Sequence, residues 1–152
     1  MTTEQLNQYL LEIDLKIMCL YLKRDDQGKV ILDENGNGIT EYFQATAGFM
    51  AISVGWYQLI HDLLEDLILT DWDRDIRQVK EKFGGLRFYV GSVSDEVYDI
   101  ISRYEKLSYE TCETCGEAGE LRQDCGWNGS MWYMTLCDKH YKELKAERRS
   151  KK

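Results

Sequence analysis

Four cysteines and one of the two histidines lie within residues 111–140, TCETCGEAGELRQDCGWNGSMWYMTLCDKH. Cys112 and Cys115 are separated by two residues and followed by a glycine, so a tight turn can direct both sulfur atoms to one point. Cys137 and His140 repeat this spacing. Three thiolates and one imidazole make up a tetrahedral set that suits Zn²⁺. The spacing predicts one structural zinc ion per chain, in a closed site that leaves no coordination position for a substrate.

Two other uses of the cysteines fit the sequence less well. A disulfide framework is typical of secreted chains, whereas this chain has five cysteines, an odd number, and no visible signal peptide. A redox CxxC pair usually opens a helix after a buried strand, but CETCGEAG continues into glycines. Cys125 is the alternative metal ligand, although we expect it in a hairpin away from both pairs. Cys19 has no partner nearby in the sequence, and we interpret it as a buried structural thiol.

The segments around the predicted zinc site follow the order knuckle, hairpin (residues 121–136) and a second ligand pair that opens a helix. This layout resembles treble-clef zinc fingers. Zinc in a closed site contributes folding free energy to a module too small to fold alone. We therefore expect two parts, an α+β domain over residues 1–109 and a zinc-binding module with a basic C-terminal helix over residues 110–152.

A second set of chemically interesting residues lies in VKEKFGGLRFYV, residues 79–90. A Gly-Gly turn would pair Phe83 with Leu86 and place cations and a tyrosine on the outer face of the ribbon. Arginine binds phosphate with two hydrogen bonds, and tyrosine can stack on a base. The face is a candidate binding surface for a nucleotide or another small anion; the favoured alternative is an ordinary polar surface paired with nearby carboxylates. Its residues are Lys80, Lys82, Arg87 and Tyr89, with Trp56 or Tyr57 as a nearby aromatic.

The elements that must position these residues can be read from hydrophobic spacing. Apolar residues at helical intervals predict three main helices, over about residues 3–23, 43–69 and 94–108, with Ser92 and Asp95 capping the third. Between the first two, clusters of Asp, Asn and Gly predict short strands broken by turns. The predicted fold class is α+β, with three main helices, a β-hairpin and a C-terminal treble-clef-like zinc module.

The charge and the motif content of the chain argue against duplex DNA binding and against enzyme activity. The formal net charge of −8 argues against duplex DNA as a partner, although the segment 138–152 carries seven Lys or Arg against three Asp or Glu. We interpret that tail as a solvated helix end whose cations suit the helix C-terminus. The chain has no phosphate-binding glycine loop and no hydrolase or metalloprotease motif. His61 and the alternating carboxylates of DWDRD (Asp71, Asp73 and Asp75) are expected to be structural, so we expect no enzyme.

The apolar runs are shorter than the roughly 20 residues that cross a bilayer, and the expected location is the cytoplasm. The segments GWYQLIHDLLEDL, QVKEKFGGLRFYV and TCETCG…TLCDKH together resemble a family of small bacteriophage and prophage proteins of unassigned function, over roughly residues 55–140. The resemblance implies a phage origin, the host cytoplasm and a zinc knuckle at the matching Cys and His positions, and it implies no activity.

Three functions remain as hypotheses. The first is a non-enzymatic phage accessory protein that binds a host protein, for example to inhibit a host defence. The second is a binder of nucleotides or nucleotide signals that uses the basic face of the hairpin. The third is a nucleic-acid-binding zinc protein. The sequence does not indicate an oligomeric state.

Overall fold

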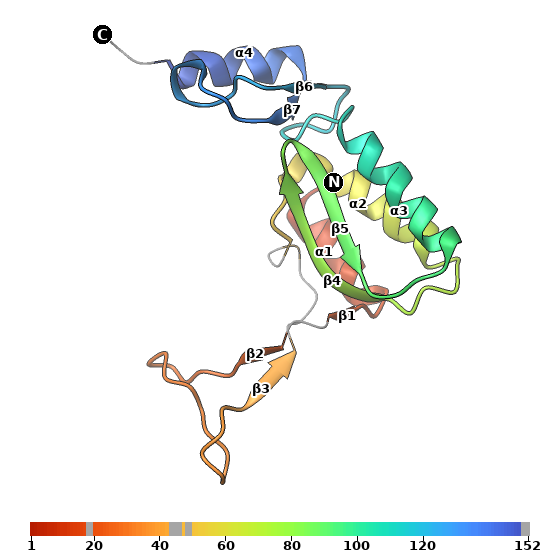
Figure 1. Ribbon diagram of the computed structural model, residues 1–152, viewed down its shortest axis with the longest axis vertical. Helices are drawn as coiled ribbons and strands as arrows, with labels where there is room; N and C mark the ends of the chain where they lie inside the picture. The colour runs from red at the N-terminus through yellow and green to blue at the C-terminus, as the bar shows by residue number, and fades with distance from the viewer. Residues whose placement is uncertain (18–19, 43–46, 48–49, 150–152) are drawn as a thin grey trace.

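Four α-helices and three small β-sheets form an α+β fold in the computed structural model, which describes residues 1–17, 20–42, 47 and 50–149 (Figure 1). The sequence predicts three main helices, whereas this part of the chain contains four. Figure 1 shows a central body, an arm at one end and a small module at the other end. The body contains α1 (Thr3–Glu12), α2 (Tyr57–Leu67), α3 (Asp95–Ser108), β1 (Lys16–Ile17), β4 (Asp75–Lys82) and β5 (Gly85–Val90).

The core lies between the three helices of the body and its three-stranded sheet. The strand order is β1-β4-β5, with β1 parallel and β5 antiparallel to β4. α2 is amphipathic at a helical period, and its broad apolar face is buried as its spacing predicts. Fully buried core side chains are Leu6, Leu10, Trp56, Ile60, Leu63, Leu64, Leu67, Ile76, Leu86 and Val97.

α1 begins where the sequence predicts but ends about eleven residues earlier than expected. Thr2 and Gln5 form a capping box, in which each side chain accepts a hydrogen bond from the backbone N–H of the other. Asp14 has a left-handed backbone with φ +52°, which ends the helix. The chain then enters β1 and β2 (Leu20–Leu22), so the prediction of a helix to residue 23 is wrong. Cys19 lies outside the described residues.

α2 is also shorter than predicted. A 3₁₀ turn (Val54–Trp56) precedes it, and residues 50–53 are not helical. Ala51 instead forms a bridge to β4, donating to the Val79 carbonyl at 3.1 Å and accepting from the Glu81 N–H at 3.1 Å. This pairing at the edge of the sheet competes with helix formation. The start of the predicted helix, residues 43–46 and 48–49, lies outside the described residues.

The hairpin β4–β5 turns one residue earlier than predicted. Its two central residues are Phe83 and Gly84, with φ +54° and +80°, the left-handed pair of a type I′ turn. The Glu81 carboxylate accepts the Gly84 N–H at 2.7 Å and fixes this turn. Lys80 consequently pairs with Arg87 instead of Tyr89. Each strand partner moves by two positions, so the strand residues keep their predicted faces. The prediction that Phe83 pairs with Leu86 is wrong, because Phe83 lies in the turn and is 61% exposed.

The cap of α3 is Ser94 and not Ser92. The Ser94 hydroxyl accepts the Val97 N–H at 3.4 Å and donates to Asp71 at 3.0 Å. Val97 and Ile101 of the predicted apolar stripe are buried, whereas Leu107 is exposed. The helix contacts β5 up to its last residue: the fully buried Ser108 accepts the Leu86 N–H at 2.9 Å, and the Glu105 carboxylate accepts the Phe88 N–H at 3.0 Å.

The arm contains β2 and β3 (Thr40–Tyr42), which pair antiparallel. Two turns separate them, as the clusters of Asp, Asn and Gly predict. Asp25 accepts the N–H groups of Gln27 and Lys29, and Asp33 accepts those of Asn35 and Asn37, all at 2.8–3.0 Å. One oxygen of Asp33 is thus used to hold the turn.

Candidate metal centre

The four predicted ligands come from a knuckle and from the start of the last helix. Cys112 and Cys115 flank a tight turn in which the N–H of Gly116, at φ +81°, donates to the Cys112 carbonyl at 2.9 Å. A hairpin of β6 (Glu120–Arg122) and β7 (Met134–Leu136) follows. Cys137 is the N-cap residue of α4 (Asp138–Glu147), and His140 lies in the first turn. β7 therefore delivers the second pair of ligands to the knuckle.

The ligand atoms of Cys112, Cys115, Cys137 and His140 all lie within 4.8 Å of one another. The sulfur atoms of Cys115 and Cys137 are 3.9 Å apart. The Nδ1 atom of His140 lies 3.2 Å from the Cys137 sulfur and 3.7 Å from the Cys112 sulfur. No other group of three or more Cys, His, Asp or Glu in the described part of the chain has this convergence. The predicted set could therefore hold a metal ion.

The surroundings of the sulfur atoms favour negative charge at one of them. Burial opposes the thiolate of Cys112, but hydrogen bonds from the backbone of Cys137, Cys115 and Thr114 and from His140 lower its pKa to about 6. At Cys115, the backbone of Glu117 favours the thiolate, yet slight burial and the neighbouring sulfur atoms raise the pKa. Several thiolates at this distance repel one another, so a cation is needed to hold them all deprotonated.

Groups around the cluster hold the ligand-bearing segments together. His140 directs Nδ1 toward the sulfur atoms, and its Nε2 faces the Glu143 carboxylate at 3.9 Å, which is longer than a hydrogen bond. Arg122 donates to the Leu136 carbonyl at 3.2 Å and to the Asp138 carboxylate at 2.8 Å. These bonds join β6 to the residues on either side of Cys137.

The module is attached to the body through backbone contacts beside the ligands. The Gly55 N–H donates to the Glu113 carbonyl at 2.8 Å, and the Trp56 Nε1 donates to the Thr111 carbonyl at 2.9 Å. The Thr135 hydroxyl, fully buried, donates to the Gly84 carbonyl at 2.7 Å. A Cβ atom at Gly55 would lie 2.3 Å from the Cys112 carbonyl oxygen, so only glycine permits this approach.

Glu113, between Cys112 and Cys115, has a buried carboxylate that the sequence did not single out. It is 3% exposed, and one of its oxygens accepts the Thr135 N–H at 2.7 Å. Burial raises its pKa to about 7; the Thr135 N–H opposes this rise, and the charge of Glu81 adds to it. A glutamate inside a knuckle has no sequence signature that separates it from a solvated one.

Cys125 is buried in the module but does not belong to the cluster. Its burial raises the pKa of its thiol. Its backbone N–H donates to the Trp132 carbonyl at 3.1 Å, and its carbonyl accepts from Arg148 at 2.6 Å. It packs near Leu136 as a small apolar side chain.

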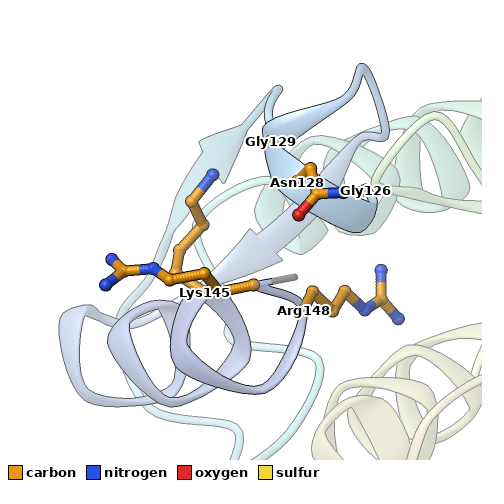
Figure 2. Close-up of a pocket in the computed structure, with 6 residues that line it drawn as sticks. Gly126, Asn128, Gly129, Lys145 and Arg148 are labelled. Atoms are coloured by element: carbon orange, nitrogen blue, oxygen red, sulfur yellow. The ribbon is translucent and has the colours of Figure 1, made fainter. Parts of the chain in front are cut away.

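The basic residues at the end of α4 have partners within the module. Figure 2 shows Lys145 and Arg148 beside the loop that carries Asn128, around a pocket of about 250 Å³. Lys145 donates to the Asp124 carbonyl at 2.7 Å and to its carboxylate at 3.0 Å. The Asn128 N–H donates to the Arg148 carbonyl at 2.8 Å. These bonds hold the loop against α4. The sequence predicts a solvated helix end and does not predict these contacts.

The candidate anion-binding residues come together only in part. Lys80, Lys82, Arg87 and Tyr89 lie on the outer face of the hairpin, and the Lys80 Nζ is 5.8 Å from the centre of the Tyr89 ring. Arg87 donates to the Tyr109 hydroxyl at 3.2 Å. Trp56 is fully buried in the core and Tyr57 is buried beside it, so neither offers a ring face to a ligand.

The other residues weighed for chemistry have structural contacts. His61 packs against Tyr9 with ring centres 4.4 Å apart and the rings tilted by 53°. Its nitrogens lie 3.1 Å from Asp62 and 3.6 Å from Glu65. Asp73 accepts the Asp75 N–H at 3.0 Å, as a turn-forming aspartate does.

An exposed apolar groove lies where the hairpin tip meets the module. Phe83 is 61% exposed, Met131 74% and Trp132 56%. Tyr133 packs edge-on against Phe83, with ring centres 5.9 Å apart. Together with Glu81 and Lys82 these residues line a groove of about 430 Å³. Large apolar side chains gathered in this way on a surface usually mark a contact site for another molecule.

Comparison with known proteins gives no relative: no family model matches the chain, and neither the curated proteins nor the solved structures include a significant match. The resemblance to phage proteins therefore stays a prediction. Within the described residues, every helix is too short or too polar to span a membrane.

Proposed function

We propose that this chain is a non-enzymatic, zinc-stabilised protein that binds another protein where its β4–β5 hairpin meets the C-terminal module. The role proposed for Cys112, Cys115, Cys137 and His140 is to hold one structural zinc ion. The role proposed for the surface around Phe83 and Trp132 is to bind the partner.

The distances between ligand atoms support zinc. Tetrahedral zinc with bonds of about 2.3 Å to sulfur and about 2.05 Å to nitrogen separates two sulfur ligands by about 3.8 Å, and sulfur from nitrogen by about 3.6 Å. The corresponding separations here are 3.9 Å between Cys115 and Cys137, and 3.2 and 3.7 Å between sulfur and His140. Four protein ligands complete the coordination, so this ion would supply folding free energy and no open position for catalysis.

The exposed aromatic groove is the observation that carries protein binding. Burying large apolar side chains contributes free energy to association, and Trp and Tyr are enriched among residues that dominate interfaces. Phe83 belongs to the hairpin, whereas Met131 and Trp132 belong to the module, so the groove exists only while the module is folded on the body. The proposed zinc ion would thereby maintain the binding surface.

The resemblance to phage proteins supports a host protein as the partner, bound in the host cytoplasm, with inhibition of a host defence as one outcome of binding. The hairpin's basic face supports the alternative, nucleotide binding, less well, because both predicted stacking residues, Trp56 and Tyr57, are buried in the core. Nucleotides that raise the melting temperature of the wild-type chain, but not of an Arg87→Glu variant, would favour that alternative.

The test combines metal analysis with partner capture. Native mass spectrometry of the purified chain should show one zinc ion per chain. Quantitative capture of proteins from host cells should give a partner whose recovery falls at least tenfold with Trp132→Ala. Tyr98→Ala, an exposed aromatic on α3, is the matched control and should leave recovery unchanged. Equal recovery with both variants would contradict binding through this groove.

A further inference from the structure

A second groove adjoins the aromatic one and differs from it in charge. It encloses about 390 Å³ and shares Glu81 and Trp132 with the first groove, so the two form one continuous surface. Its floor contains the buried Glu113. The remaining lining residues are Met50, Ala51, Ile52, Ser53 and Met134.

The two carboxylates of the second groove are arranged in the same way. Glu81 uses one oxygen to accept the Gly84 N–H at 2.7 Å, and Glu113 uses one to accept the Thr135 N–H at 2.7 Å. Among the described residues, no hydrogen-bond donor approaches the second oxygen of either side chain. Backbone groups therefore hold both carboxylates in place and leave one oxygen of each available to a ligand.

The charge of this groove is uncompensated. The described residues that line it include these two carboxylates and no lysine or arginine. Lys82 lines only the neighbouring groove, where its Nζ lies 5.6 Å from the centre of the Phe83 ring. Glu113 is 3% exposed, and a buried carboxylate without a cationic partner is costly. The half-buried Glu81 carboxylate repels it. The indole of Trp132 at the boundary adds a ring face that attracts a cation.

We infer that the protein partner inserts a basic side chain, best an arginine, between Glu81 and Glu113, while apolar side chains beside it occupy the groove of Phe83, Met131 and Trp132. This inference rests on the proposed function and names the chemistry of its partner. A guanidinium group has five N–H donors in one plane, enough to bond both available oxygens and keep a face for the indole. The thioethers of Met50 and Met134 can pack on the aliphatic part of the side chain.

The inference can be tested with defined peptides. The probes are the acetylated and amidated tripeptides Phe-Arg-Phe and Phe-citrulline-Phe, since citrulline has the shape of arginine without its charge. Each is titrated into the zinc-loaded full chain and followed by the NMR signals of the Trp132 indole and of the Glu81 and Glu113 backbone amides. The arginine peptide should bind at least tenfold more tightly than the citrulline peptide.

Isosteric variants assign the effect to the carboxylates. Glu81→Gln should lower affinity for the arginine peptide at least tenfold and leave that for the citrulline peptide unchanged, because glutamine still accepts the Gly84 N–H. Glu113→Gln should act in the same direction, provided that zinc content stays at one per chain. Glu96→Gln, an exposed residue in the first turn of α3, is the control and should change neither affinity.

Three results would overturn the inference. Equal affinity for the two peptides would mean that only apolar side chains are recognised. Absence of shifts at Trp132 would mean that neither groove binds the probes. Dimers that disappear in Trp132→Ala would mean that a second copy of the chain occupies the surface. If neither peptide binds but partner capture still depends on Trp132, the proposed protein binding is supported and the proposed recognition of a basic side chain is contradicted. If Trp132 is dispensable in both, the proposed function fails as well.

Discussion

The indole of Trp56 donates a 2.9 Å hydrogen bond to the carbonyl of Thr111, the residue directly before the first candidate metal ligand. Trp56 is fully buried at the start of α2. This side chain therefore links the ligand cluster directly to the hydrophobic core, in addition to the bonds of Gly55 and Thr135. A structural change at the cluster should therefore alter the packing of Trp56 in the core, and a change in that packing should alter the cluster.

Removal of the metal is the first test of this coupling. We expect one zinc ion per purified chain, and chelation should unfold the module and expose the Trp56 indole N–H to solvent exchange, measured by NMR. Cys112→Ser and Cys137→Ser should give the same result without chelator. Cys125→Ala should keep one zinc ion, because Cys125 is buried but lies outside the cluster. Less than half an equivalent of metal in a folded, unchelated preparation would contradict the site.

Gly55→Ala should destabilise the protein by about 2–3 kcal/mol or more, because the new Cβ would overlap backbone atoms of Cys112 and Glu113 at 2.3–2.4 Å. Urea unfolding measures the change. Gly91→Ala is the matched control, since its Cβ would meet only the end of the flexible Arg77 side chain at 3.3 Å. A loss below about 0.5 kcal/mol for Gly55→Ala would mean that the module can move away from α2 at little cost.

Thr135→Val should cost about 1–3 kcal/mol, because it leaves the buried Gly84 carbonyl without its donor while keeping the side-chain shape. Zinc content should not change. Thr111→Val removes a comparable 2.8 Å bond to the Leu107 carbonyl at an exposed site, where water replaces the hydroxyl, and should cost less. Chemical unfolding of both variants gives the comparison, and equal losses would argue against a tight contact between the hairpin tip and β7.

Arg87 and Tyr109 should be energetically coupled through their 3.2 Å hydrogen bond. In a double-mutant cycle of Arg87→Ala and Tyr109→Phe, we expect a coupling free energy of about 0.5–1 kcal/mol, near the low end for hydrogen bonds because Arg87 is partly exposed. Lys80→Ala paired with Tyr109→Phe should show none. A coupling free energy near zero in the first cycle would indicate that Tyr109 does not hold Arg87, and that Arg87 is available to bind an external anion.

Affinity for duplex DNA should be weak, about 10⁻⁴ to 10⁻⁶ M near physiological salt, the range of non-specific binding. The net charge is −8, and Lys145 and Arg148 already bond to Asp124 and Cys125. Fluorescence anisotropy with an arbitrary labelled duplex measures this affinity. Submicromolar binding would favour the nucleic-acid-binding hypothesis.

The candidate metal ligands could be predicted from sequence because their spacing is local: a CxxC knuckle and a CxxH pair each need one turn of chain to converge. Helix lengths could not, because tertiary contacts decide them. The backbone of Ala51 pairs with β4 and so cannot be helical, although the sequence around it is compatible with a helix. The left-handed Asp14 has a similar effect at the end of α1.

The hairpin shows the same limit at a finer scale. KFGGL allows a turn at Phe83-Gly84 or at Gly84-Gly85, and propensity alone favours two glycines. In the observed turn, the Glu81 carboxylate accepts the Gly84 N–H. The same turn places Gly85 against the Tyr109 ring, where a Cβ atom would lie 2.3 Å from a ring carbon. The groove with Glu113 was missed for a related reason, since its walls come from segments far apart in the chain.

The bonds from Trp56 to Thr111 and from Thr135 to Gly84 span 55 and 51 residues. During synthesis, the ribosome releases Trp56 and the hairpin tip well before His140, so the core and Phe83 are made before the proposed zinc site is complete. If zinc holds the module together as proposed, Trp132 would come to line one groove with Phe83 only after metal capture. Zinc supply would then control how many newly made chains acquire the proposed partner-binding groove, and zinc starvation would lead to chains with a body but without that surface.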